Sequence, residues 1–465
     1  MKALAPTLVS GLDVLPILEG GKGVSVSNGF TAGAFAAAGA VGTFSCVNAD
    51  FLDADGNPVR QVYQSNTRGE RFQELIDFAV KGGIAQARIA HDVAGGAGRI
   101  HMNVLWEAGG TEQILHGVLE KTKDIVHGVT CGAGMPYKVA EIAAKYAVYY
   151  YPIISSARAF RALWKRAYSK YADWLGGVVY EDPWLAGGHN GLSNAEDPLV
   201  PQHPYERVRE LRDIMRQFGL GETPILMAGG VWYLRDWEDW IDNDELGPIV
   251  FQYGTRPILT QESPVSEEWI TRYLTLKEGD VSLNKFSPTG FYSSAVNNRF
   301  LAELAGRSDR QVDVASKPEG ELTEKLTYGS RSRHAYVRPA DKARAEAWMA
   351  EGYTEPMWTP DDTFIFVESD KAQQIRQDQK DCMGCLSQCR FSNWADNERG
   401  GTGRKTDPRS FCIQKTLQDI AHGGPVDDNL MFAGHNAFKF ASDPFYKDGF
   451  IPTVKQLVDR IVTGD

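Results

Sequence analysis

The sequence has few cysteines, no long apolar run and no excess of positive charge. Its 465 residues include only six cysteines, too few for a secreted scaffold held together by disulfide bonds. The longest run of small apolar residues, 32–44, contains glycines and is shorter than the roughly 20 residues that cross a bilayer. The segment 1–13 lacks the apolar core of a signal peptide. We therefore expect a cytoplasmic protein without a membrane segment.

The charge balance limits the partners. Lys and Arg number 49 against 60 Asp and Glu, so the net charge is -11. Binding to a nucleic-acid backbone depends on clustered Lys and Arg, so we expect a small-molecule substrate rather than a nucleic acid. Apolar residues make up 43% and charged residues 23% of the chain, which is typical of globular proteins and excludes global disorder. The composition leaves the oligomeric state open.

Eight short apolar runs, each followed by a turn and most by an amphipathic stretch, occupy the first 262 residues. The expected strands are 14–18, 40–45, 100–105, 125–130, 148–154, 177–180, 224–227 and 248–252. Strands that alternate with helices pair in parallel, and eight such units close into a (β/α)8 TIM barrel, of mixed α/β class. A doubly wound sheet is the alternative. One of the helices is predicted over 157–175, where apolar residues recur at helical spacing.

The alternation of strands and helices stops after residue 262. Residues 306–380 are charged and rich in turns, which indicates an insertion or lid rather than a second barrel. We therefore divide the chain into a barrel over 1–305, an insertion or lid over 306–380, and a cysteine-cluster segment with a closing helix over 381–465. The closing helix is expected at 453–462.

Glycine-rich turns follow five of the expected strands. They lie at 20–23, 131–136, 186–191, 228–230 and 254–256. In TIM barrels the active site lies at the carboxyl ends of the strands, and glycine allows backbone N–H groups to approach a ligand closely. The turns after the seventh and eighth strands form a standard phosphate site, to which Arg256 would add a positive charge. The five turns together predict a phosphorylated planar cofactor at the barrel mouth.

His189 lies between glycines at the end of the sixth expected strand. An imidazole titrates near neutral pH, so it can remove a proton from an acidic C–H group or supply one. The alternative is a structural histidine that caps a loop.

Four of the six cysteines are clustered within 31 residues: Cys382, Cys385, Cys389 and Cys412. Four thiolates hold either one tetrahedral zinc ion or one [4Fe–4S] cluster. Zinc ribbons pair two C-x2-C motifs, whereas here the second half is a single cysteine. We therefore predict a [4Fe–4S] cluster, with zinc and free thiols as the alternatives.

Five segments together resemble the nitronate monooxygenase family, formerly called 2-nitropropane dioxygenases. They are GGKGVSVSN at 20–28, GAGMP at 132–136, AGGHNG at 186–191, AGGV at 228–231 and GTR at 254–256. The family is similar in turn to flavin-dependent enoyl-acyl-carrier-protein reductases. Two further segments, SPTGFYSSAVNN at 287–298 and FAGHNAFK at 432–439, resemble a subgroup of the family that carries a C-terminal cysteine cluster. In that subgroup the two segments lie closer together in the sequence.

The resemblance implies a barrel that binds FMN and uses His189 as the catalytic base. The residues expected at the cofactor are Gly21, Gly23 and Asn103 by the flavin ring, Gly187 and Gly188 along the ribityl chain, and Gly229, Gly230, Gly254 and Thr255 at the phosphate. Lys22 takes the place of an apolar residue near the ring, where its charge would stabilise a reduced flavin. An exposed loop lysine is the alternative for Lys22.

The resemblance implies an FMN-dependent oxidoreductase that oxidises an alkyl nitronate or nitroalkane-like substrate with O2. The cysteine cluster motivates an alternative, an FMN and [4Fe–4S] reductase of an activated C=C bond that takes electrons from NAD(P)H or a ferredoxin. A flavin- or metal-binding protein without catalytic activity is the third hypothesis.

Overall fold

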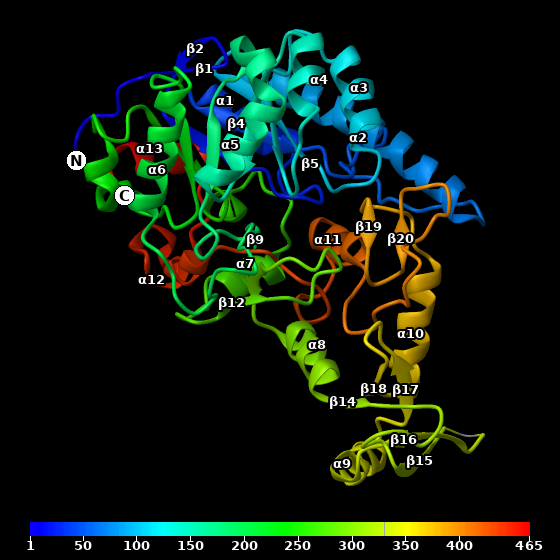
Figure 1. Cartoon of the computed structure of the whole chain (residues 1–465). Coiled ribbons are helices and arrows are strands. Elements are labelled where there is room, and N and C mark those ends of the chain that lie inside the picture. Colours follow the sequence, from blue (N-terminus) through cyan, green and yellow to red (C-terminus); the bar gives the residue numbers. More distant parts are fainter. Residues whose placement is uncertain (330) are drawn as a thin grey trace.

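Eight parallel strands close into a barrel in the computed structural model, which describes residues 1–329 and 331–465 (Figure 1). The barrel strands are β3 (Ile17–Glu19), β4 (Val41–Ser45), β5 (Arg99–Leu105), β6 (Gly128–Gly132), β7 (Tyr149–Ile154), β8 (Val178–Glu181), β10 (Ile225–Ala228) and β11 (Ile249–Tyr253). Each of the eight expected strands overlaps one of them. The predicted (β/α)8 TIM barrel is therefore confirmed.

The first barrel strand begins later than expected, because residues before it form a separate hairpin. β1 (Thr7–Val9) pairs with β2 (Leu12–Val14) in an antiparallel ladder. Val9 and Val14 pack into the core inside the barrel. At the turn of the hairpin, the Ser10 hydroxyl lies 2.9 Å from His101 Nε2 and 2.7 Å from Tyr151 Oη. The hairpin therefore plugs the end of the barrel at which the strands begin.

Helices surround the barrel. They are α1 (Gly29–Ala37), α2 (Arg68–Ala94), α3 (Thr111–Lys121), α4 (Val139–Lys145), α5 (Ala157–Arg166), α6 (Pro204–Gln217) and α13 (Val454–Val462). The helix expected over 157–175 breaks at Ala167 (φ -142°) and continues as the 3-10 helix η1 (Tyr168–Trp174). The expected closing helix is α13, with Thr453 as its N-cap. It contacts α1 and thereby completes the outer ring.

Short elements lie at the carboxyl ends of the barrel strands (Figure 1). An antiparallel sheet has the order β12–β13–β9. The strands and helices of this layer are β9 (Gly188–His189), β12 (Val281–Asn284), β13 (Ser293–Val296), β19 (Gln388–Cys389), β20 (Trp394–Ala395), α7 (Glu267–Tyr273), α8 (Arg299–Asp309), α11 (Ile413–Ala421) and α12 (Lys439–Ser442). The remaining 3-10 helices are η2 (Leu234–Trp240), η3 (Arg256–Leu259), η4 (Val426–Asp428), η5 (His435–Phe438) and η6 (Pro444–Gly449).

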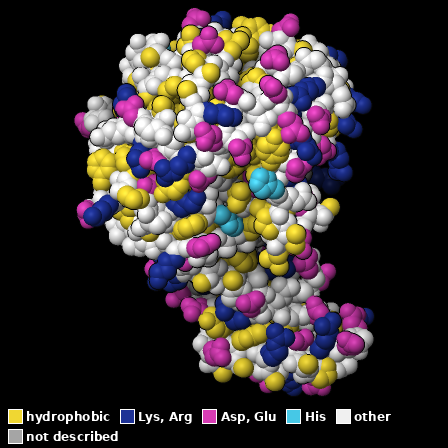
Figure 2. Space-filling model, turned by 90° about the vertical axis from the view of Figure 1, so that its left-hand side faces the viewer, with side chains coloured by type: hydrophobic (Ala, Val, Ile, Leu, Met, Phe, Trp, Pro, Cys, Tyr) yellow, Lys and Arg dark blue, Asp and Glu magenta, His cyan; other side chains and the backbone are white. Residues whose placement is uncertain are grey.

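A small arm, which we define as residues 311–367, projects away from the barrel and is a separate lobe in the space-filling view (Figures 1 and 2). It contains β14 (Gln311–Asp313), β15 (Glu324–Tyr328), β16 (Arg333–Val337), α9 (Pro339–Ala350), β17 (Glu355–Trp358) and β18 (Thr363–Val367), and α10 (Ser369–Lys380) leads back from it. The arm has its own apolar core, which includes Leu326 and Phe364. Our division of the chain at residues 305 and 380 stays a prediction.

None of the helices among the described residues combines the length and the apolar character that crossing a membrane requires.

Candidate functional site

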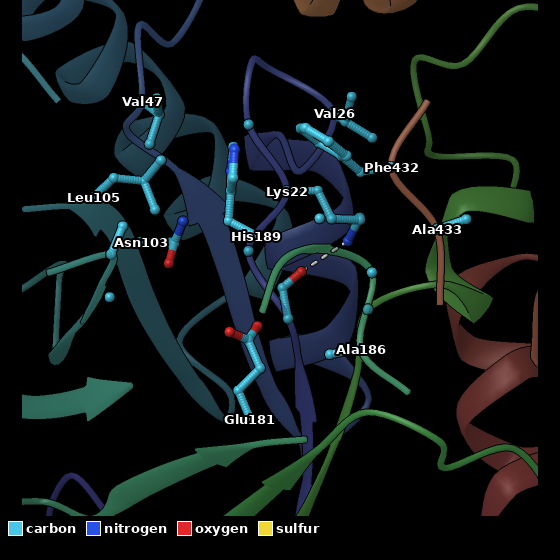
Figure 3. Close-up of a pocket in the computed structure, with 18 of the residues that line it drawn as sticks. Lys22, Val26, Val47, Asn103, Leu105, Glu181, Ala186, His189, Phe432 and Ala433 are labelled. Atoms are coloured by element: carbon cyan, nitrogen blue, oxygen red, sulfur yellow. Dashed lines mark hydrogen bonds between the residues drawn. The ribbon is translucent and has the colours of Figure 1, made fainter. Parts of the chain in front are cut away.

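A large cavity opens at the carboxyl ends of the barrel strands (Figure 3). Its volume is about 1770 Å³ when it is measured out to the open solvent at its mouth.

All the residues that the sequence predicts for cofactor binding and proton transfer line this one cavity. They are Gly21, Gly23, Asn103, Gly187, Gly188, His189, Gly229, Gly230, Gly254 and Thr255. The structure therefore brings together turns that are up to 234 residues apart in the sequence (21 to 255). The individual roles of these residues stay predictions.

The glycines differ in what a side chain at their position would meet. A Cβ on Gly21 would overlap the side chain of Asn103, and one on Gly187 would lie 2.5 Å from the carbonyl carbon of Ala433. Gly229 has a φ of +97°, which L side chains rarely adopt. A Cβ on Gly254, in contrast, would meet nothing within 4 Å. Gly254 therefore borders open space in the cavity.

Four backbone N–H groups at the ends of β10 and β11 are without a partner. Within the described chain, the N–H groups of Gly229, Gly230, Gly254 and Thr255 donate no hydrogen bond. Gly229, Gly230 and Thr255 are half-buried and Gly254 is exposed, so these N–H groups face the open cavity, and successive free N–H groups of this kind can bind an anion. The C-terminal segment holds both turns: Gly434 N donates to Thr255 Oγ1 (2.9 Å), and Asn436 Nδ2 donates to the Gly230 carbonyl (2.6 Å).

Arg256 does not contribute to this anion site. Its Nη1 donates to the carbonyls of Trp232 (2.9 Å) and Asp465 (3.0 Å), and its Nη2 lies 4.0 Å from Asp443 Oδ2. Our expectation that Arg256 adds a charge to the phosphate site is therefore wrong. Its guanidinium instead joins β11 to the C-terminal part of the chain.

His189 lies on β9 and contacts two residues of the layer above the barrel. Its Nε2 is 2.6 Å from Ser287 Oγ, and its ring centroid is 5.2 Å from that of Phe432. Ser287 Oγ is in turn 2.9 Å from Thr289 Oγ1. Burial lowers the pKa of His189 to about 4, so the imidazole is neutral at pH 7. A neutral imidazole is the form that can accept a proton.

Lys22 lines the cavity, but its charge is compensated. Its Nζ lies 3.1 Å from Glu19 Oε1 and 2.9 Å from the Gly20 carbonyl oxygen. Ser27 Oγ also donates to Glu19 (3.0 Å). Burial lowers the pKa of Lys22, and the charge of Glu19 opposes this effect. Lys22 is therefore not an exposed loop residue.

The residues that cover the cavity were not predicted from the sequence. Segments of the chain beyond residue 380 contribute Cys385, Leu386, Ile413, Gln414, Leu417, Ile420, Met431, Phe432, Ala433, Gly434 and Asn436. Among the described residues of 306–380, none lines the cavity. Part of this cover could have been found from the sequence, because the segment FAGHNAFK at 432–439 resembles a segment of a subgroup of the nitronate monooxygenase family.

Glu181, the last residue of β8, also lines the cavity and was not predicted from the sequence (Figure 3). It comes one residue after the expected strand 177–180, at the position where barrel enzymes carry functional groups.

The four clustered cysteines converge beside the cavity as free thiols. Burial, followed by the charges of the other three, raises the pKa of Cys385, which itself lines the cavity. The pKa of Cys389 rises to about 11 and that of Cys412 to about 12, in both cases mainly through burial. Within residues 1–329 and 331–465, no three His, Cys, Asp or Glu side chains are arranged to hold a metal ion. Neither the predicted [4Fe–4S] cluster nor the zinc alternative is therefore confirmed.

Comparisons with known proteins address the fold and the family. The chain is similar to nitroalkane oxidase from Streptomyces ansochromogenes, with 14% identity, a TM-score of 0.52, and coverage of 99% of this chain and 96% of that one. It also matches FabK from Thermotoga maritima (14% identity, TM-score 0.49, coverage 97% and 92%). A third match is the enoyl reductase domain of MlnA from Bacillus amyloliquefaciens (11% identity, TM-score 0.49, coverage 97% and 93%). No curated protein sequence matches the chain.

At 14% identity, the likeness to nitroalkane oxidase shows the fold alone. The family is shown by the sequence, because the family model described as nitronate monooxygenase matches residues 8–353. That match covers most of the chain and includes the five glycine turns and His189. The chain therefore belongs to the nitronate monooxygenase family and is an FMN-dependent oxidoreductase.

Proposed function

We propose that this enzyme binds FMN at the barrel mouth and oxidises an alkyl nitronate or a related nitroalkane with O2, with His189 as the base. The observation that carries the proposal is the meeting of His189, the glycine turns and the four free N–H groups at one cavity. When bound there, FMN would supply the redox chemistry, accepting electrons from the substrate and passing them to O2.

The cavity fits the parts of FMN. The free N–H groups of Gly229, Gly230, Gly254 and Thr255 would bind the phosphate. The flavin ring would lie by Gly21, Gly23 and Asn103, and the ribityl chain by Gly187 and Gly188. The apolar wall contributed by α11 and by Phe432 would exclude water from the remaining space, where a small apolar substrate would bind.

His189 would act only on the neutral substrate. A nitroalkane has an acidic C–H group beside the nitro group, and removal of that proton yields the nitronate. The neutral imidazole accepts the proton, while Ser287 fixes the orientation of the ring through the 2.6 Å contact. A nitronate that is supplied directly needs no base.

The contrast between the neutral nitroalkane, which needs a base, and the nitronate, which does not, tests the role of His189. The variant His189→Asn should keep FMN and oxidation of the nitronate but lose about 10²–10⁴-fold in the rate with the neutral nitroalkane, the range expected for a general base. His334→Asn, at an exposed position of the arm, is the control. Equal losses with both substrates would contradict the role as base. Protein without FMN would contradict the proposed cofactor.

A second candidate function is supported by the position of Cys385, which places the cysteine cluster at the wall of the cavity. The enzyme would then reduce an activated C=C bond with electrons from NAD(P)H or a ferredoxin. Anaerobic reductive titration separates the two functions. The oxygenase is reduced by the nitronate and hardly by NAD(P)H, and the reductase behaves in the opposite way.

For the cysteines themselves, we propose a [4Fe–4S] cluster, with zinc as the alternative. Support comes from the donor set: four free thiols close enough to influence one another's pKa, with backbone N–H groups directed at Cys385, Cys389 and Cys412. Hydrogen bonds to the sulfurs are typical of such clusters. Free thiols also support a cytoplasmic location. Iron, sulfide and zinc analysis of anaerobically purified protein tests the assignment.

A further inference from the structure

The cover of the cavity differs in character from the barrel end below it. Among the described residues beyond 380 that line the cavity, none is acidic or basic. α11 contributes Ile413, Leu417 and Ile420 to the lining, and these residues recur at the spacing of one helical face. The barrel strands and their turns, in contrast, contribute charged side chains such as Lys22 and Glu181. The cavity therefore has a polar end and an apolar side.

Phe291 adds an exposed aromatic ring to this lining. It lies in the segment between β12 and β13 and is 43% exposed. Of the large apolar side chains that are exposed in the described chain, Phe291 alone lines the cavity. A single exposed apolar side chain is common on protein surfaces. One that borders a ligand cavity can cover an apolar part of the ligand, because such sites are lined mainly by apolar and aromatic side chains.

The backbone beneath Phe291 is held by the cysteine-cluster segment. Ser410 Oγ donates a hydrogen bond to the Phe286 carbonyl (2.6 Å). The Arg390 N–H donates to the Pro288 carbonyl (3.0 Å). Two hydrogen bonds from outside the loop therefore fix the part of the chain that presents the exposed ring.

The same loop connects Phe291 to the proposed base. The Phe291 N–H donates to Thr289 Oγ1 (3.2 Å), which is 2.9 Å from Ser287 Oγ. Ser287 Oγ is in turn the atom that lies 2.6 Å from His189 Nε2. A second ring that lines the cavity, that of Phe432, lies 5.2 Å from the His189 ring (Figure 3). One aromatic side chain of the lining is therefore beside the base, and the other is at the protein surface.

We propose that Phe291 is a specificity-determining residue, which binds the apolar end of a substrate with a straight alkyl chain while the nitro or nitronate group lies at His189. The inference rests on the proposed function in taking this head group, and it narrows the substrate class to molecules whose chain reaches Phe291. The chain lies against the uncharged cover formed by α11 and Phe432, so binding removes its surface from water. A substrate with only one or two carbons leaves Phe291 without a contact.

The size of the effect follows from the burial of methylene groups. Each methylene group that leaves water completely raises the affinity about fourfold. The nitronates of nitroethane and 1-nitrohexane differ by four such groups. Because the end of the chain at Phe291 stays partly exposed, we expect kcat/KM to rise at least about tenfold from the shorter to the longer nitronate, less than full burial would give.

The experiment measures kcat/KM of the full-length enzyme for both nitronates. In Phe291→Ala the ratio of the longer to the shorter nitronate should fall at least about fivefold, because less of the chain is covered. Phe291→Leu, which keeps a large apolar side chain, should restore most of the ratio. Phe30→Ala is the matched control, since it removes a ring that is 42% exposed on α1 and does not line the cavity. An unchanged ratio in Phe291→Ala, or a wild-type kcat/KM that does not rise with chain length, would overturn the inference.

A second measurement does not depend on turnover. Straight-chain carboxylates share the planar head group with two oxygens of a nitronate but do not react. In calorimetric titrations of the protein as purified, hexanoate should bind more tightly than propionate, and this preference should be smaller in Phe291→Ala. Equal affinities in the wild type would overturn the inference, even if Phe291→Ala failed to fold. A wild type that prefers hexanoate but oxidises no nitronate would instead overturn the proposed function and support the role of Phe291 in binding an alkyl chain.

Discussion

His189 Nε2 and Ser287 Oγ are separated by 2.6 Å, and this contact joins the glycine turn after β8 to the segment between β12 and β13. Ser287 is buried, so the ring nitrogen that contacts it is held by the protein and not by solvent. The ring orientation therefore depends on two parts of the chain that are 98 residues apart.

Replacement of Ser287 by alanine should weaken proton abstraction without displacing FMN. A net contribution of about 0.5–1.5 kcal/mol per hydrogen bond corresponds to a loss of up to about tenfold in kcat with a neutral nitroalkane. Oxidation of the preformed nitronate should be unchanged. Ser282→Ala, which removes a hydroxyl bonded to Asn297 instead, is the control. Wild-type kcat with both substrates would contradict the role of Ser287 in orienting the histidine.

Substitution of Gly254 by alanine should separate ligand binding from folding. Its Cβ would meet nothing within 4 Å, so the thermal unfolding midpoint should stay within a few degrees of the wild type. The methyl group would, however, stand in front of the free N–H groups proposed for the phosphate, and the Kd of FMN should rise at least tenfold. Gly69→Ala, equally open but in the first turn of α2, is the control. Unchanged FMN affinity in Gly254→Ala would place the phosphate elsewhere.

His101 should make the folded state sensitive to acid. It is fully buried against the Ser10 hairpin, and burial lowers its pKa to about 3. The unfolded chain binds a proton near pH 6.5, whereas the folded chain does not. Stability is therefore lost as the pH falls below about 6.5, by about 2 kcal/mol at pH 5. Urea unfolding at pH 7 and pH 5 should show this loss in the wild type and in the exposed-site variant His334→Gln, but a smaller loss in His101→Gln. Equal losses in all three proteins would contradict the assignment.

The proposed metal cluster should depend on the one remote cysteine. Cys412→Ser should lose most of its iron and acid-labile sulfide, because the cube requires four ligands. Cys131→Ser changes a buried cysteine of β6 outside the cluster, so its iron content should match that of the wild type. Zinc in place of iron in the anaerobically purified wild type would favour the alternative metal, and the absence of both metals would leave the cysteines as free thiols.

The barrel was predictable from the sequence because its signals are local. Each strand is a short apolar run, and each functional turn follows its strand directly, so Gly21, Gly229 and His189 could be placed without knowledge of the fold. The hairpin before β3 was missed, because the expected strand 14–18 joined Val14, the last residue of β2, to β3, and only the pairing of β2 with β1 separates the two strands.

The remaining features of the site depend on contacts between distant residues. Whether Glu181 faces the interior follows from the register of β8 with β10, which a single sequence does not reveal. The cover provided by Phe432 and Ala433 depends on packing against Gly187 and His189, more than 240 residues earlier in the chain (432 against 189). The direction of Arg256 likewise depends on Asp465 at the far end of the chain.

The arm leaves and rejoins the body of the molecule at neighbouring positions, since β14 and β18 are paired, with Gln311 opposite Ile365. It has its own core, and none of its described residues borders the cavity. Met357, which lies between these two strands, packs into the apolar core that contains Cys382 and Cys389, so only insertions in the loops away from this residue should leave the active site unaltered. The arm is therefore the part of this architecture in which an inserted loop or a fused reporter domain would lie furthest from the chemistry.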